Sequence, residues 1–403
     1  MGLKIAPAKS GPDYIDGQYL SLAANSPSIN LDDFAFSKKQ LLGLSYSQAK
    51  NADLLLVEGA MGLFDGGANG AGSSANLALK LGLPIILVID CSSMAQSIAA
   101  LVFGFKNYNK NINIAGVILN KVASFRHEKM LREALEPLKI TVLGAIYNND
   151  ALKIKSRHLG LTLPNEIAKA ENLISQGAKI IASSLDLDKV LALALPLKKQ
   201  NNTPQLAPLG QHIAIAKDDC FAFIYQHILL SWQTQGAQIS FFSPLNNEAP
   251  DSEVDAIFLP GGYPELYAQN LTNCDIFFKG LINAANRNAL IYGECGGFMV
   301  LGETLIDKNG ITHKMSGLLP ISSAINSPKR ILGYRHLCHK SPLPFAKNLL
   351  GHEFHYSTCT KSKLPTLFSA KDSYDKKLPA MGIIKDNVMG SYAHIISANS
   401  EAK

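Results

Sequence analysis

Short apolar runs alternate with segments of helical period through most of the chain. In the first half, runs with almost no polar side lie at 53–57, 84–90 and 112–120. Strands that are covered by helices on both faces have this pattern, so we expect buried parallel strands here. The helices predicted between them run from a Ser73 or Ser74 cap to Leu81, from 94 to 105 and from 127 to 138.

The same alternation resumes after a polar, proline-bearing segment at 198–208, which is typical of a linker. Strands are predicted at 212–216, 238–242, 256–259 and 289–292, with helices near 221–234 and 276–285. This rhythm predicts an α/β protein with two doubly wound domains. The expected boundaries are 1–195 for the first domain, 196–210 for the linker and 211–403 for the second domain.

Composition narrows the class of protein. A chain of 403 residues is too long for one ordinary domain. Charged residues make up only 17% of it, yet no apolar stretch is long enough to span a bilayer, so we expect a soluble protein without a membrane partner. The net charge of +6 comes from lysines spread through both halves, which argues against nucleic acid and favours small anionic substrates.

The six cysteines are scattered, without CxxC pairs or a secretory signal. This distribution predicts reduced thiols in the cytoplasm and makes a structural zinc site a poor expectation. The sequence leaves open whether the chain works as a monomer or as a homodimer.

Cys295 lies where an apolar run, LIYGECGGFM at 290–299, passes from a strand into a helix. On base rates, a lone cysteine in such a run is a small buried side chain. Here two glycines follow, which would let the backbone reverse tightly and aim helix N–H groups at the sulfur. The helix end is then expected to favour the thiolate, so Cys295 is a candidate nucleophile.

Two other segments supply candidate partners for Cys295. The loop after the strand at 256–259 contains Gly261, Gly262 and Tyr263, whose backbone N–H groups could form an oxyanion hole. His394 could act as the base. His352 and His355 compete for that role, or hold substrate, or belong to a hydrogen-bonded loop.

Four motifs together resemble the class I glutamine amidotransferase domain of the cobyrinic or hydrogenobyrinic acid a,c-diamide synthases. They are Gly261–Leu266, Gly293–Gly297, Gly351–His355 and Ser391–His394. The resemblance implies a flavodoxin-like domain in which Cys295 attacks the side-chain amide of glutamine and His394 shuttles the proton. Ile396 stands where many such enzymes have a glutamate, so the third member of the Cys/His pair stays open.

The first half resembles the dethiobiotin-synthetase-like, P-loop NTPase-like half of the same family. The similarity lies in Gly11–Asp16, Glu58–Gly66, Asn120 and Arg157–Leu161. It implies that Asp13 and Glu58 help to hold Mg²⁺ on ATP, that Tyr14, Asp16 and Asp65 bind substrate, and that Asn120 reads adenine. From the residues alone, Glu58 would emerge at the carboxyl end of its strand, and Asp13 and Asp16 could equally shape a turn.

One element of that family is missing from the sequence. No Gly-rich loop ending in Gly-Lys-Thr occurs, the glycines at 66–72 lack the lysine, and Lys9 does not replace it by spacing. We expect the sheet of the first domain to have a gap where the strand before that loop would lie, with apolar faces exposed. A start codon assigned too far downstream would account for this.

The implied reaction is an amidation of the a and c acetate groups of hydrogenobyrinic or cobyrinic acid. ATP would activate each carboxylate as an acyl phosphate, and ammonia from glutamine would displace the phosphate. A nickel-sirohydrochlorin a,c-diamide synthase and a cobyric acid synthase are the enzyme alternatives. The missing phosphate loop also keeps open a non-catalytic remnant.

Overall fold

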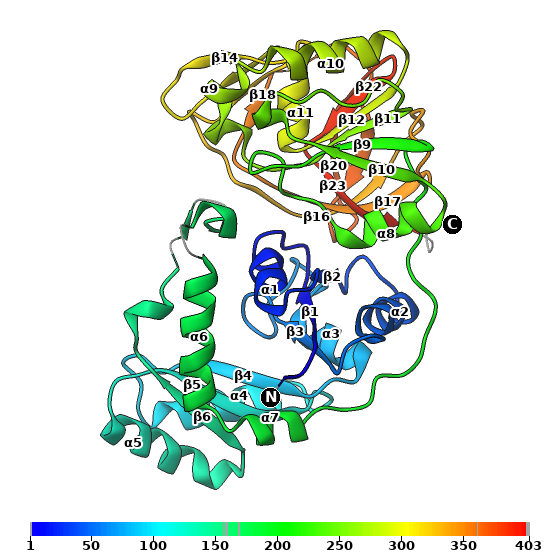
Figure 1. Cartoon of the computed structure of the whole chain (residues 1–403). Coiled ribbons are helices and arrows are strands. Elements are labelled where there is room, and N and C mark those ends of the chain that lie inside the picture. The colour runs from blue at the N-terminus through cyan, green and yellow to red at the C-terminus, as the bar shows by residue number, and fades with distance from the viewer. Residues whose placement is uncertain (1, 155, 158–159, 168–169, 361, 400–403) are drawn as a thin grey trace.

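The computed structural model describes residues 2–154, 156–157, 160–167, 170–360 and 362–399. Two lobes follow one another along the chain, and Figure 1 shows the blue-to-green N-terminal lobe below the green-to-red C-terminal lobe. An extended segment after α7 (Leu187–Ala192) climbs along one side to the C-terminal lobe. None of the helices in the described residues is long and apolar enough to cross a membrane.

The N-terminal lobe contains two separate parallel sheets instead of one. The first has the order β2-β1-β3 and the second the order β4-β5-β6. Their strands are β1 (Ile5–Ser10), β2 (Ile29–Leu31), β3 (Leu54–Glu58), β4 (Ile85–Asp90), β5 (Ile114–Val122) and β6 (Val142–Tyr147). A short antiparallel pair, β7 (Ser156–Arg157) and β8 (Gly160–Leu161), lies apart from them.

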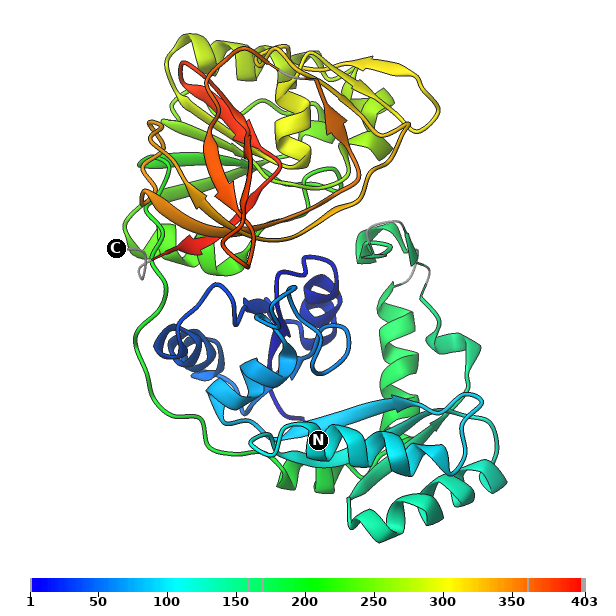
Figure 2. The same cartoon turned by 180° about the vertical axis from the view of Figure 1, so that it is seen from behind.

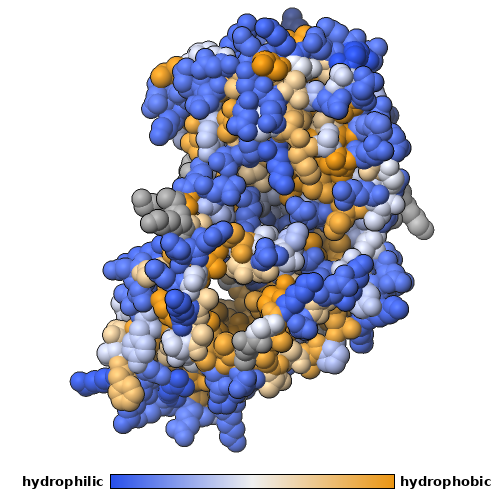
Figure 3. All heavy atoms as spheres, in the orientation of Figure 1, coloured by the Kyte–Doolittle hydropathy of each residue, from blue (hydrophilic) through white to orange (hydrophobic). Residues whose placement is uncertain are grey.

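The break between the two sheets agrees with the gap expected from the sequence. Within the described residues, β3 and β4 each pair on one side only. Leu56 on β3 and Val88 on β4 are 53% and 57% exposed, although their strands are almost wholly apolar. Figure 3 shows apolar surface around a hollow in this lobe.

Helices pack around these sheets, largely where the sequence predicts them. They are α1 (Asp16–Ala24), α2 (Lys38–Ala49), α3 (Ser74–Leu81), α4 (Ser97–Tyr108), α5 (Phe125–Leu135), α6 (Ala170–Ser184) and α7. Ser73 caps α3, because its hydroxyl accepts the N–H of Asn76 at 3.2 Å. The helix predicted from 94 begins only at Ser97, because Asp90 accepts the N–H of Ser92 and holds the preceding residues in a turn.

The C-terminal lobe is built on a continuous six-stranded sheet of order β10-β9-β11-β12-β22-β21. All its neighbours are parallel except the edge strand β21. The strands are β9 (His212–Ala216), β10 (Gln238–Phe242), β11 (Ala256–Leu259), β12 (Leu290–Glu294), β21 (Ile383–Lys385) and β22 (Val388–Ser391). The helices are α8 (Gln226–Thr234), α9 (Ala268–Leu271), α10 (Asp275–Asn286) and α11 (Gly296–Leu301).

Two antiparallel sheets complete this lobe, and the sequence pattern did not predict them. The larger has the order β20-β19-β16-β17-β23, and the smaller β14-β13-β15-β18, whose β13 and β15 are parallel. Their strands are β13 (Thr304–Ile306), β14 (Thr312–Lys314), β15 (Ser322–Ala324), β16 (Ile331–Cys338), β17 (Asn348–His355), β18 (Thr358–Cys359), β19 (Phe368–Lys371), β20 (Lys377–Met381) and β23 (His394–Ala398). Figure 2 shows the orange and red strands of the larger sheet facing the N-terminal lobe.

The two lobes share an apolar cluster. It includes Phe36 and Leu41 from the N-terminal lobe and Tyr225 and Ile396 from the C-terminal lobe. The hydroxyl of Ser397 also donates to the carbonyl of Ala35 at 2.8 Å. The lobes are therefore packed against each other, and residues from both can contribute to one site.

Candidate active site

Cys295 occupies a strained turn between β12 and α11. Its φ of 48° and ψ of −107° are unusual for a residue with a side chain, and its N–H donates to the carbonyl of Ser391 at 2.8 Å. The following glycines do not supply the positive φ, contrary to the expectation. They allow close packing instead, since a Cβ on Gly297 would lie 1.9 Å from the carbonyl oxygen of Leu259.

The predicted nucleophile, Cys295, and the predicted base, His394, both lie next to Gly261. A Cβ on Gly261 would come within 2.4 Å of His394 Cε1 and 3.3 Å of Cys295 Cβ. The predicted oxyanion hole needs one correction. The N–H of Tyr263 donates to the carbonyl of Cys220 at 3.0 Å, so only the backbone of Gly261 and Gly262 stays a candidate.

Burial controls the charge of both groups. It raises the pKa of Cys295 above the usual thiol range, against the expectation that the helix end would favour the thiolate. Burial, followed by the neighbouring His352 and His355, also lowers the pKa of His394. The resting pair is therefore a thiol and a neutral imidazole, the form that can accept a proton.

Glu294 lies beside His394 but does not hydrogen-bond it, and His394 Nδ1 has no hydrogen-bond partner within the described residues. One carboxylate oxygen, Oε2, lies 3.8 Å from His394 Nδ1. The other, Oε1, accepts the N–H of Ile395 and the hydroxyl of Tyr292, both at 3.1 Å. Burial raises the pKa of Glu294 to about 8. Its place one residue before the nucleophile gave no signal, because the sequence does not show which way a strand residue points.

The competing histidines stand beside His394 in the wall of the site. His352 is paired with His394 across β17 and β23, and their rings stack at 4.8 Å. Burial lowers the pKa of His352 to about 3, and its Nε2 meets the hydroxyl of Tyr225 at 2.8 Å. His355 is held by the carbonyl of Ser357 and stacks on Tyr392. Of His352, His355 and His394, it is His394 that is among the three groups nearest to a Cβ on Gly261, together with Phe223 and Cys295.

A second cluster gathers at the carboxyl ends of β1 and β3. Lys9, which is 2% exposed, places Nζ 2.6 Å from Asp16 Oδ2, 3.4 Å from Glu58 Oε1 and 2.9 Å from the carbonyl of Gly59. Burial alone would lower the pKa of Lys9, but Glu58 and Asp16 raise it. The sequence analysis set Lys9 aside, because its spacing does not match the lysine of a Gly-rich loop.

Asp13 joins this cluster from the turn before α1. Its Oδ1 accepts the N–H groups of Ile15 and Asp16 at 2.8 and 3.0 Å, so it does shape the turn. Burial, followed by the charge of Asp16, raises the pKa of Asp13, and burial also raises the pKa of Glu58 although Lys9 opposes it.

Asp13 and Glu58, the predicted metal ligands, could supply only part of the ligand set of Mg²⁺. Among the described residues, no group of three or more His, Cys, Asp or Glu side chains could hold a metal ion. Asp13 and Glu58 instead fit an ion that takes most of its ligands from phosphate and water, which is how Mg²⁺ usually binds.

The remaining predicted residues lie apart from this cluster. Asp65, in the loop after β3, accepts the N–H of Gly62 at 3.1 Å. Asn120 belongs to β5 in the other sheet, where its Oδ1 accepts the N–H of Lys121 at 2.9 Å. Of the segment Arg157–Leu161, residues 158 and 159 and the side chains fall outside the described part of the chain.

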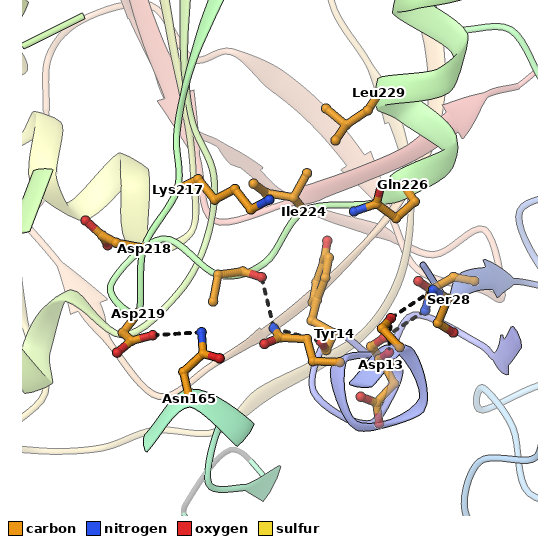
Figure 4. A pocket seen from close by; sticks show the side chains of 15 residues that line it. Asp13, Tyr14, Ser28, Asn165, Lys217, Asp218, Asp219, Ile224, Gln226 and Leu229 are labelled. Carbon is orange, nitrogen blue, oxygen red and sulfur yellow. Dashed lines mark hydrogen bonds between the residues drawn. The ribbon is translucent and has the colours of Figure 1, made fainter. Parts of the chain in front are cut away.

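A cavity of about 390 Å³ opens between the two lobes beside these clusters. Asp13 and Tyr14 line it from the N-terminal lobe, and Lys217, Asp218 and Gln226 line it from the C-terminal lobe (Figure 4). Gln18 bridges the lobes here, since its Nε2 donates to the carbonyl of Ala222 at 3.2 Å.

Comparisons with known proteins agree with this two-part organisation. Residues 212–402 match the model of the CobB/CobQ-like glutamine amidotransferase domain, and residues 17–156 match that of an AAA domain. Hydrogenobyrinate a,c-diamide synthase from Brucella abortus is 45% identical over 406 residues, covering 100% of this chain and 93% of the relative. The enzyme of that name from Rhizobium meliloti is 44% identical and covers 98% and 92%. The solved structure of PurLQS from Thermotoga maritima overlaps 46% of this chain and 87% of that chain with 17% identity and a TM-score of 0.34, which is too little to carry an argument.

Proposed function

Because this chain belongs to the hydrogenobyrinate a,c-diamide synthase family, we propose that it amidates the a and c acetate groups of hydrogenobyrinic or cobyrinic acid with glutamine and ATP. The observation that carries the proposal is Cys295 in its strained turn, with His394 on the other side of Gly261. A nucleophile on such a turn, beside a neutral imidazole, suits acyl transfer.

In the glutaminase half-reaction, His394 takes the proton of Cys295 as the sulfur attacks the side-chain carbonyl of glutamine. Backbone N–H groups of Gly261 and Gly262 stabilise the oxyanion. The imidazolium returns the proton to the leaving nitrogen, ammonia departs, and water hydrolyses the thioester. Glu294, whose Oε2 lies 3.8 Å from His394 Nδ1, is the carboxylate that we propose to orient the imidazole once the two atoms come within hydrogen-bond distance.

In the synthetase half-reaction, the γ-phosphoryl group passes from ATP to an acetate oxygen, and ammonia then displaces phosphate from the acyl phosphate. Mg²⁺ held by phosphate oxygens with Asp13 and Glu58 would offset the charge that develops during transfer. Lys9 adds a buried cation at the same strand ends, and Asp16 keeps it in place. Tyr14 and Asp65 are proposed to contact substrate, and Asn120 to contact adenine.

We place the protein in the cytoplasm, with small molecules as its substrates and with a homodimer as an assembly to be tested. All six cysteines, in the described residues, are free thiols, as expected of a reducing compartment. The net charge of +6 favours a substrate with many carboxylates.

The proposal predicts that the protein releases ammonia from glutamine and that Cys295→Ser abolishes this release. Cys338→Ser is the matched control, because Cys338 is a partly exposed free cysteine on β16, where its strand neighbours are Asn348 and Ser369. Ammonia is measured with ATP, Mg²⁺ and corrinoid present. If the wild type releases no more than Cys295→Ser, the glutaminase proposal is wrong.

A second measurement identifies the acceptor. Hydrogenobyrinic and cobyrinic acid are incubated separately with ATP, Mg²⁺ and glutamine, and the product mass shows none, one or two amidations. Two amidations of either acid support the proposal. No mass change with both acids, while glutamine is hydrolysed, would leave the chain a glutaminase without this synthetase activity.

A further inference from the structure

Tyr14 belongs to the turn that carries Asp13 and Asp16, yet its ring lies in the other lobe. The ring centre is 5.2 Å from that of His394 and 5.0 Å from that of Phe223, with which it stacks at 10°. Figure 4 shows the ring rising from the start of α1 toward the C-terminal lobe. A residue predicted to bind substrate in one site thus touches the proposed base of the other.

The contact also reaches the proposed oxyanion loop. The N–H of Phe223 donates to the carbonyl of Gly261 at 3.0 Å, so the ring under Tyr14 is tied to the backbone that faces Cys295. Moving Tyr14 would disturb both His394 and Gly261.

A second route runs from Tyr14 through Tyr225. These rings lie 4.3 Å apart, and the hydroxyl of Tyr225 meets His352 Nε2 at 2.8 Å. His352 in turn stacks on His394 with an interplanar angle of 11°. His394 is therefore packed between rings whose positions depend on Tyr14.

At the other end, the backbone of the turn is fixed to the N-terminal lobe. Asn30 Nδ2 donates to the carbonyls of Gly11 and Asp13 at 2.9 and 2.7 Å. The Asp13 carboxylate accepts the N–H groups of Ile15 and Asp16 on the far side of Tyr14, so a ligand that draws this carboxylate away would release the turn that carries the ring.

We propose that Tyr14 is a positioning residue that holds the imidazole of His394 opposite Cys295. Through this contact, the rate of glutamine hydrolysis depends on whether a ligand occupies the cluster around Lys9. This inference rests on the proposed function. The ring, and not the hydroxyl, makes the contacts with His394 and Phe223, so Tyr14→Phe should preserve the coupling and Tyr14→Ala should remove it.

The first test compares two nitrogen sources within each variant. Amidation is measured with glutamine and with ammonium chloride in wild type, Tyr14→Phe, Tyr14→Ala and Tyr108→Ala, in which an exposed tyrosine of the same lobe is removed. In Tyr14→Ala, the glutamine rate should fall roughly tenfold or more relative to the ammonium rate, because a displaced base slows only the glutaminase. An unchanged ratio would mean that Tyr14 serves only substrate binding and would overturn the inference.

The second test reads Cys295 without amidation. A diazoketone analogue of glutamine alkylates the thiol, and intact mass follows the rate with and without ATP, Mg²⁺ and corrinoid. These ligands should change the rate in wild type and Tyr14→Phe, but not in Tyr14→Ala. If the ligands still change the alkylation rate in Tyr14→Ala, the inference about Tyr14 is wrong and the proposed function is unaffected. Failure of the wild type to react overturns it together with the glutaminase proposal, whereas normal labelling without amidation counts only against the synthetase proposal.

Discussion

The sheet of the C-terminal lobe runs unbroken from β10 to β21, whereas the N-terminal lobe divides its parallel strands between β3 and β4. The sequences of the strands do not differ in kind. AIFL in β11 is buried at every residue, but LLLVE in β3 is not buried at any. An apolar run therefore predicts a strand, but whether that strand is buried depends on the strands and helices that pack against it.

Paired leucine truncations test this comparison with the largest expected effect. Leu259, on β11, is fully buried, so Leu259→Ala should lower the free energy of unfolding by about 2–5 kcal/mol. Leu56, on β3, is 53% exposed, and Leu56→Ala should cost less than about 1 kcal/mol. Urea unfolding followed by tryptophan fluorescence and circular dichroism measures both. Equal losses would show that the edge of β3 is covered in solution.

Gly261→Ala tests whether His394 must lie beside Gly261 for glutamine hydrolysis. Because its Cβ would lie 2.4 Å from His394 Cε1, Gly261→Ala should displace the imidazole and reduce glutaminase activity by about 100-fold. Gly104→Ala is the control in the N-terminal lobe, where nothing lies within 4 Å of the new methyl, and it should leave glutaminase unchanged. Full activity of Gly261→Ala would remove His394 from its assigned role.

Glu294→Gln tests the open third position. The amide keeps the volume but cannot ionise, so above pH 8, where Glu294 is charged, kcat for glutamine hydrolysis should drop by about 10- to 100-fold while KM changes little. The buried Glu353, which pairs with Arg335, provides a second carboxylate for comparison as Glu353→Gln. If kcat is unaffected by Glu294→Gln, the 3.8 Å approach to His394 has no catalytic role.

The pH dependence of stability tests the buried carboxyl of Glu294. Since burial raises the folded-state pKa of Glu294 to about 8, the unfolded chain loses this proton at lower pH than the folded protein. The unfolded state is then favoured as pH rises from about 4.5 toward 8, so Glu294 makes the protein less stable across that window. Between pH 5.5 and pH 8, the urea midpoint of unfolding should fall by more in the wild type than in Glu294→Gln. Identical falls would show that Glu294 is already ionised at pH 5.5.

The residues that sequence reasoning located share a local signal. The cap at Ser73, the strand that ends before Cys295 and the strands β9, β10 and β11 all depend on neighbours in sequence, whereas β21 and β22 of the same sheet were not predicted. Glu294 was missed because its role depends on the direction of one side chain. Lys9 was set aside by its spacing, and the lysine and proline of β1 obscure the strand that positions it.

Contacts between distant segments were also out of reach. The antiparallel strands β16, β17 and β23 mix polar and apolar residues on both faces, and their pairing decides which histidine meets His394. The insertion of Tyr14 beside His394 joins residues from different lobes, and no local pattern encodes such a contact. The family resemblance supplied names for these residues but not their arrangement.

The apolar cluster shared by the lobes has a consequence for how the chain can be divided. Leu195, at the start of the connecting segment, is 56% exposed and within reach of a protease, while Phe36 and Ile396 are sealed against each other's lobe. Cutting the connection there would yield two fragments that stay associated, because separation would expose the cluster to water. The connecting segment is therefore expected to serve as a tether, and the shared apolar cluster is expected to hold the lobes together.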